Sequence, residues 1–137
     1  MVRGKTFIDT NVLLCLFSGE TAKADRAEEV VEEGGWLSVQ VLNEFVAVAS
    51  RKLGMTWSEI GEATGTIRAV CQVASLSDET HDLGLRIAER YGFAFYDALI
   101  VAAALQSGCE ILYTEDLQDG QRIEGSLVIS NPFKIEE

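Results

Sequence analysis

Four acidic residues occupy positions that carboxylates usually avoid. Asp9 and Asp116 each stand just after a short apolar run that is typical of a strand. Glu44 and Asp97 fall on the apolar faces of predicted helices. An unpaired buried charge costs several kcal/mol or shifts its pKa until the group is neutral. These acids therefore suggest a site whose negative charge is balanced by cations.

Each acid also has a structural explanation. Asp9 and Asp97 stand near helix N-termini, where an acid can cap the first turn or interact favourably with the helix dipole. Glu44 could reach solvent or Arg51 from the edge of its helix. Glu115, in the loop after the later strand, is expected to face solvent. Taken singly, each residue leaves the structural and the functional explanation open.

Four carboxylates in one cleft would define the chemistry of that cleft. No His or Cys accompanies them, so the site would offer hard oxygen ligands, which select Mg²⁺ or Mn²⁺. Such a cation can activate a water for attack on a phosphodiester and can neutralise the charge of the transition state. Sites with one ion and with two ions are both compatible with the pattern.

The elements that must position these acids alternate along the chain. Short strands are predicted at residues 6–8, 36–39, 110–113 and 127–129, and helices at 10–17, 22–33, 41–53, 57 to about 74, 78–91 and 96–106. This alternation predicts an α/β fold, an α/β/α sandwich with a short-stranded parallel sheet. In such sheets ligands bind at the carboxyl ends of the strands, where Asp9 and Asp116 fall.

Length and composition limit the remaining possibilities. The chain has 137 residues and no linker-like segment, so a single domain over 1–137 is expected. The net charge of -11 excludes adhesion to membranes or nucleic acid by bulk charge, and no apolar run is long enough to span a bilayer. Cys15, Cys71 and Cys109 form no metal or disulfide pattern, and free thiols suit a cytoplasmic protein.

Four segments together resemble the PIN-domain family of nucleases, and within it the VapC-type toxins of type II toxin-antitoxin systems. They are 7–13 (FIDTNVL), 42–45 (LNEF), 96–100 (YDALI) and 113–117 (YTEDL). The match runs over nearly the whole chain, and the order and spacing of the segments make it fairly specific.

The resemblance implies a Mg²⁺ or Mn²⁺-dependent endoribonuclease directed at single strands, a homodimer, and an antitoxin that holds the toxin inactive. The family's acidic metal ligands match Asp9, Glu44, Asp97 and Asp116, and its supporting polar positions match Asn11 and Thr114. RNA contact also requires basic groups outside the acidic centre. The candidates are Lys23, Arg26, Arg51, Lys52, Arg68, Arg86 and Arg90.

Other functions remain as alternatives. The chain could be a non-catalytic PIN-fold binding or scaffold module, in which the acids serve as caps and ion-pair partners. A phosphorylated receiver domain needs an acidic pair after its first strand, where Thr10 follows Asp9, and a haloacid-type phosphatase needs an Asp at position 11, which is Asn11. His81 is expected to be exposed, and Trp36 and Trp57 are expected in the core or an interface.

Overall fold

The computed structural model describes residues 5–134, which form a six-stranded sheet in the order β3-β2-β1-β4-β6-β5. All neighbouring strands are parallel except β5 and β6. The strands are β1 (Thr6–Ile8), β2 (Trp36–Ser38), β3 (Gln72–Ala74), β4 (Ile111–Tyr113), β5 (Arg122–Ile123) and β6 (Leu127–Ser130). β1 is fully buried near the centre of the sheet, and Asp9 follows its carboxyl end directly.

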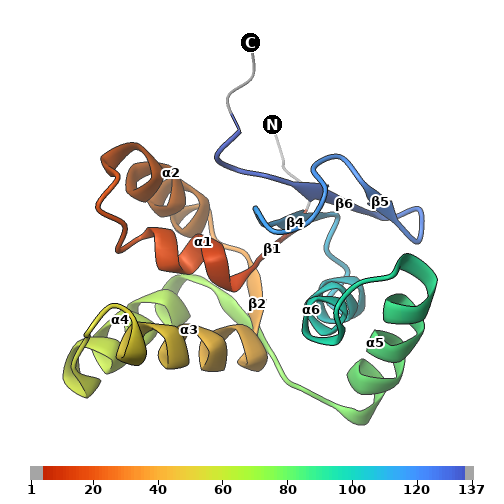
Figure 1. The fold of residues 1–137 in the computed structure, drawn as a ribbon, viewed down its shortest axis with the longest axis horizontal. Coiled ribbons are helices and arrows are strands. Elements are labelled where there is room, and N and C mark those ends of the chain that lie inside the picture. The colour runs from red at the N-terminus through yellow and green to blue at the C-terminus, as the bar shows by residue number, and fades with distance from the viewer. Residues whose placement is uncertain (1–4, 135–137) are drawn as a thin grey trace.

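Helices cover both faces of this sheet, with α1 and α2 on one side and α5 and α6 on the other (Figure 1). The helices are α1 (Thr10–Cys15), α2 (Thr21–Glu32), α3 (Val39–Arg51), α4 (Trp57–Val70), α5 (Asp78–Tyr91) and α6 (Phe95–Gln106). The predicted α/β/α sandwich with a short-stranded, mostly parallel sheet is confirmed.

Two strands were not predicted. The helix expected to reach residue 74 ends at Val70, because Cys71 is extended and Gln72–Ala74 pairs with β2. A short apolar run does not distinguish a helix end from a buried strand, and the neighbouring strand decides the conformation here. β5 has only two residues, and it forms the antiparallel edge through a hairpin with β6.

Local signals set most of the helix ends. Ser38 caps α3, and Ser77 caps α5. A capping box begins α4, because the side chains of Thr56 and Glu59 each accept a hydrogen bond from the other residue's backbone N–H. Thr21 has a side chain suited to capping, but α2 begins at this residue and its N-cap, Glu20, makes no side-chain hydrogen bond.

The core lies on both faces of the central strands and includes most of α6. The three cysteines are free and buried, as expected, and burial raises the pKa of the Cys109 thiol to about 11. His81 is exposed, as predicted. Trp36 packs on the core, whereas Trp57 is 72% exposed and lies outside the core, so of its two predicted places only an interface remains. Among residues 5–134, no helix is both long and apolar enough to cross a bilayer.

Candidate active site

Asp9 lies at the point where β1 ends and α1 begins, and its carboxylate is buried. Its Oδ1 accepts a 2.6 Å hydrogen bond from the backbone N–H of Thr10, so the residue is the N-cap of α1. Its backbone N–H donates to the carbonyl of Tyr113 at the end of β4. The capping role that was one explanation of Asp9 is therefore present, and it leaves Oδ2 for other partners.

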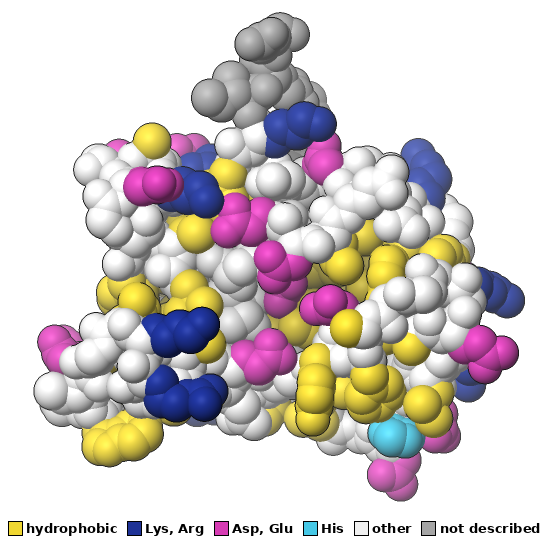
Figure 2. Space-filling view, in the orientation of Figure 1, with side chains coloured by type: hydrophobic (Ala, Val, Ile, Leu, Met, Phe, Trp, Pro, Cys, Tyr) yellow, Lys and Arg dark blue, Asp and Glu magenta, His cyan; other side chains and the backbone are white. Residues whose placement is uncertain are grey.

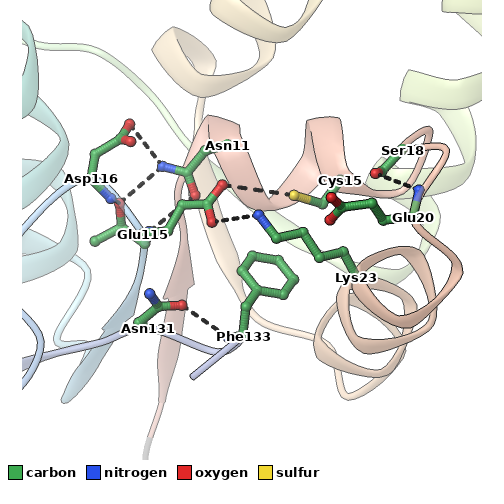
Figure 3. Close-up of polar contacts among 10 residues, drawn as sticks. Asn11, Cys15, Ser18, Glu20, Lys23, Glu115, Asp116, Asn131 and Phe133 are labelled. Carbon is green, nitrogen blue, oxygen red and sulfur yellow. Dashed lines mark hydrogen bonds and ion pairs between the residues drawn. The ribbon is translucent and has the colours of Figure 1, made fainter. Parts of the chain in front are cut away.

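Asn11 and Thr114 connect Asp9 with Asp116. The hydroxyl of Thr114 donates to Oδ2 of Asp9 at 2.8 Å. The Nδ2 group of Asn11 lies 3.0 Å from both Thr114 Oγ1 and Asp116 Oδ2, and 3.3 Å from Asp9 Oδ2. Because the backbone N–H of Glu115 donates to Asn11 Oδ1, the amide is oriented with its NH₂ group toward the acids (Figure 3).

Glu44 reaches the same region from α3. Its Oε1 lies 3.3 Å from the hydroxyl of Thr10, and its Oε2 accepts a 3.1 Å hydrogen bond from Gln40. Arg51, the alternative partner considered for Glu44, instead donates from Nε to the carbonyl of Ala47. Glu44 is thus directed toward α1 and the acids.

Asp97 lies in the first turn of α6 and is partly buried. No group within the described part of the chain donates a hydrogen bond to its carboxylate, and α6 has no side-chain cap. Burial raises the pKa of Asp97, and the charges of Asp116 and Glu44 raise this pKa further. A hydrogen-bonded cap therefore does not explain the residue, although the helix dipole still favours it.

Mutual repulsion identifies the four carboxylates as one cluster, called the acidic cluster below: Asp9, Glu44, Asp97 and Asp116. Burial raises the pKa of Asp9 from 3.8 to about 6, although hydrogen bonds from Thr114 and Thr10 lower it. The charges of Asp116 and Glu44 add to the increase in this pKa. The fold thus brings together side chains from β1, α3, α6 and the loop after β4.

The chemistry of the acidic cluster suits a hard divalent cation, but its geometry does not place three side chains around one ion. All the atoms that it offers to a cation are carboxylate oxygens, and the Asn11 amide and the Thr114 hydroxyl contact two of these carboxylates. Between residues 5 and 134, no group of three His, Cys, Asp or Glu side chains is placed to hold a metal ion. Mg²⁺ usually keeps several waters and takes one or two carboxylates directly, so the looser arrangement suits a hydrated ion.

Glu115 is half-buried and paired rather than directed freely into solvent, so the prediction for this residue holds only in part. Its Oε2 lies 3.1 Å from Nζ of Lys23 on α2, and its Oε1 lies 3.9 Å from Sγ of Cys15. The Lys23 ammonium also lies over the ring of Phe133, 5.3 Å from its centroid. Figure 3 shows Glu115 extending toward Lys23 while the neighbouring Asp116 points to Asn11. Because Glu115 is paired with Lys23, its carboxylate is not part of the acidic cluster.

Gln40 was missed by sequence reasoning. Its Nε2 donates to Glu44 at 3.1 Å and to the carbonyl of Tyr96 at 3.2 Å, so it connects α3 with the start of α6. A Gln four residues before a Glu on a helix is a weak signal of such a contact. The contact to Tyr96 has no sequence signal, because residues 40 and 96 are brought together only by the fold.

An apolar groove adjoins the acidic cluster on the side of α5 and α6. Its volume is about 640 Å³, and it is lined by residues that include Gln40, Glu44, Leu76, His81, Tyr96 and Leu99. Figure 2 shows acidic side chains at the centre of this face and hydrophobic side chains beside them near the single histidine. Leu76 and Tyr96 are 46% and 68% exposed.

Comparisons with known proteins agree with this architecture. The family described as PIN domain matches residues 6–122. The fold is similar to that of a toxin-antitoxin complex from Klebsiella pneumoniae, with a TM-score of 0.73 and 21% identity over 96% of this chain and 100% of that chain. A search of curated proteins found no match.

Two further solved structures share the fold. VapC20 of Mycobacterium tuberculosis, described as a sarcin-ricin loop cleaving toxin, has a TM-score of 0.67 and 18% identity over 82% of this chain and 90% of that chain. VapBC2 from Rickettsia felis, bound to a DNA fragment from its promoter, has a TM-score of 0.66 and 16% identity over 92% of this chain and 97% of that chain. At these identities the likeness shows the fold.

Proposed function

The chain belongs to the PIN domain family, and from this premise we propose that it is a divalent-metal-dependent endoribonuclease that hydrolyses RNA phosphodiesters. The observation that carries the proposal is the convergence of Asp9, Glu44, Asp97 and Asp116 at the carboxyl ends of β1 and β4. Scattered structural carboxylates would not repel one another or share polar partners. This edge of a parallel sheet is also where ligands bind in α/β proteins.

The four acids would hold a hydrated Mg²⁺ or Mn²⁺, some of them through its waters, with Asn11 and Thr114 as supporting residues. When bound, such an ion would lower the pKa of a water and offset the charge that develops on the phosphodiester. Asn11 and Thr114 orient Asp9 and Asp116, while Gln40 and Thr10 orient Glu44. Asp97 has no hydrogen-bond donor within residues 5–134, so its oxygens are available to a ligand.

We further propose that the enzyme is the toxin of a toxin-antitoxin pair, with a cognate antitoxin as partner and the cytoplasm as its location. The support is that one structure of similar fold is described as a toxin-antitoxin complex and another as a sarcin-ricin loop cleaving toxin. Residues 1–137 would act as one domain. A short gene for a DNA-binding protein beside this one would agree with the toxin role.

A homodimer is the proposed assembly. Leu76 and Tyr96 line the groove, and Leu85 lies on α5 one helical turn after the groove residue His81. These large apolar side chains are 46%, 68% and 51% exposed, respectively. An apolar face of this kind usually marks a protein–protein contact. Sedimentation equilibrium should give the mass of a dimer for the wild type and a lower mass for the Leu85→Glu variant.

Cleavage of RNA by the purified protein tests the main proposal. The wild type should cut single-stranded RNA in Mg²⁺, stop when EDTA is added, and lose this activity in Asp9→Asn. The control is Asp82→Asn, because Asp82 is an exposed acid of α5 outside the acidic cluster. Cleavage that persists in Asp9→Asn would contradict the assignment.

Titration calorimetry separates the enzyme from a non-catalytic PIN-fold scaffold. Mn²⁺ should release or absorb heat on binding to the wild type, and this signal should be lost in Asp97→Asn. If the wild type gives no Mn²⁺ heat and cuts no RNA, the acids serve as caps and local partners, and the scaffold alternative is correct.

A further inference from the structure

An RNA substrate creates an electrostatic difficulty for this chain. Asp and Glu number 22 against 11 Lys and Arg, and the acidic cluster faces the proposed position of a phosphodiester. Proteins bind RNA mainly by placing Lys or Arg on its phosphates, with release of counterions. A track for the RNA backbone therefore requires basic side chains that are near the cluster and are not already paired with acids.

Several of the seven basic candidates are already engaged. Lys23 is paired with Glu115, and Arg90 is paired with Glu124 at 2.7 Å. Arg26 donates to the carbonyl of Pro132 at 2.8 Å and lies 3.5 Å from a Glu29 carboxylate oxygen. Arg86 lines the same cavity as Arg90 and Glu124, and its charge contributes to lowering the pKa of Glu124.

Arg51 and Lys52 differ from these residues because they lie at the end of the helix that carries Glu44. Arg51 comes seven residues after Glu44, which is two helical turns, so the two side chains share one face about 10 Å apart along the axis. Both basic residues are exposed, and within residues 5–134 neither forms an ion pair with an acid.

A hydrogen bond also fixes the direction of the Arg51 side chain. Its Nε donates a 3.2 Å hydrogen bond to the carbonyl of Ala47, one turn back along α3. The side chain therefore folds back over the preceding turn of α3, on the Glu44 side of Arg51, and its terminal nitrogens have no acidic partner in the described chain. Figure 2 shows Lys and Arg side chains over α3 on the face that carries the central acids.

We propose that Arg51 and Lys52 bind the phosphate backbone of single-stranded RNA beside the bond that is cleaved. This inference rests on the proposed function. Axial separations from Glu44 of about 10 Å for Arg51 and about 12 Å for Lys52 assign the two residues to a flanking phosphate rather than to the phosphate that is cleaved. The strand would cross the acidic cluster and continue along α3, where its charge meets positive groups.

The salt dependence of binding tests this inference. A fluorescently labelled single-stranded RNA of mixed sequence is titrated, in Mg²⁺, with the Asp9→Asn protein, which does not cut it under the proposed function. Adding Arg51→Ala and Lys52→Ala should weaken binding about 10-fold in 50 mM salt and less than about 2-fold in 200 mM salt. The slope of log affinity against log salt should become shallower by about 0.7 for each lost contact.

Two controls separate a local contact from a general loss of charge. Arg68→Ala removes an exposed and unpaired Arg from α4, and it should leave the salt slope unchanged. Exchanging the two residues, Arg51→Lys with Lys52→Arg, keeps the charge and should retain most of the affinity, and an unchanged thermal unfolding temperature of the double alanine variant excludes misfolding as the cause of its weaker binding. Equal effects of Arg68→Ala and the double variant would overturn the inference, as would an unchanged slope. Failure of the wild type to cut RNA that it binds would overturn only the proposed function.

Discussion

The hydroxyl of Thr114 donates a 2.8 Å hydrogen bond to Oδ2 of Asp9, a residue 105 positions earlier in the chain. Thr114 is fully buried, and its Oγ1 also accepts hydrogen bonds from the Asn11 amide and from the backbone N–H of Asp116. One hydroxyl thus joins the ends of β1 and β4 and sets the relative positions of two acids.

Replacing Thr114 with Val should therefore damage both stability and activity. Valine keeps the shape of the side chain but leaves the donors of Asn11 and Asp116 without this acceptor. The expected loss is about 1–3 kcal/mol in the free energy of unfolding and about 10-fold to 100-fold in RNA cleavage. Urea denaturation and initial cleavage rates measure the two effects.

Thr114→Ser and Thr66→Val are the matched controls. Serine retains the hydroxyl, so cleavage should largely survive. Thr66 donates to the carbonyl of Glu62 on the exposed surface of α4, and its replacement should change stability by less than about 0.5 kcal/mol. Equal effects of Thr66→Val and Thr114→Val would show that the buried hydroxyl has no special role.

The raised pKa of Asp9 predicts an unusual dependence of stability on pH. With a pKa of about 6 in the folded protein and 3.8 when unfolded, Asp9 binds its proton more tightly in the folded state. Its contribution to stability is fully present below about pH 4 and is lost as the pH rises to about 6, by up to about 3 kcal/mol. Denaturation in EDTA from pH 4 to 7 measures this loss.

Asp9→Asn cannot titrate at this position, so its stability should lack the decline between pH 4 and 6. The variant should be at least as stable as the wild type at pH 7 without metal, because an amide carries no charge into the cluster. A parallel decline in both proteins would assign the pH dependence to other groups.

Asp97 provides a test that separates metal binding from the helix dipole. In EDTA, Asp97→Asn should unfold at the same or a higher temperature, because the change removes repulsion from Asp116 and Glu44. Mg²⁺ at 100 times its dissociation constant should stabilise the wild type by about 2.7 kcal/mol and the variant much less. Differential scanning calorimetry with and without Mg²⁺ gives both quantities.

Asp78→Asn is the control for this test, because Asp78 also lies in the first turn of a helix but is exposed and outside the cluster. Loss of its interaction with the helix dipole should cost up to about 1 kcal/mol, with and without Mg²⁺. If Asp97→Asn behaves like Asp78→Asn, the dipole explanation of Asp97 is correct.

Features that depend on neighbours in the sequence could be predicted. The strand before Asp9, the capping box of Thr56 and Glu59, and the end of α5 at Gly92 all rest on residues within one or two turns. Gly92 has a φ of 74°, a conformation that glycine adopts without strain. Such features can be predicted because they depend on residues that are close in the sequence.

Features that depend on tertiary partners could not be predicted. β3 exists because Gln72–Ala74 pairs with β2, and Glu115 is only partly exposed because it pairs with Lys23 of α2. Gln40 connects Glu44 with the Tyr96 carbonyl across two helices that are distant in sequence. The positions of the acids in the sequence made them candidates. The groups that orient them could not be predicted, because they come from elements that are distant in the sequence.

The contact of α5 with α6 gives a prediction about packing that is independent of the site. A Cβ added to Gly84 would lie 2.7 Å from Cδ2 and 3.4 Å from Cγ of Leu99. Gly84→Ala should therefore force Leu99 to move and destabilise the protein by about 1–3 kcal/mol.

Gly61→Ala is the matched control, because a Cβ at this exposed helical position meets nothing within 4 Å and should stabilise α4 by about 0.5–1 kcal/mol. Thermal unfolding of both variants measures the difference, and stabilisation by Gly84→Ala would show that α5 and α6 pack less closely than the structure indicates.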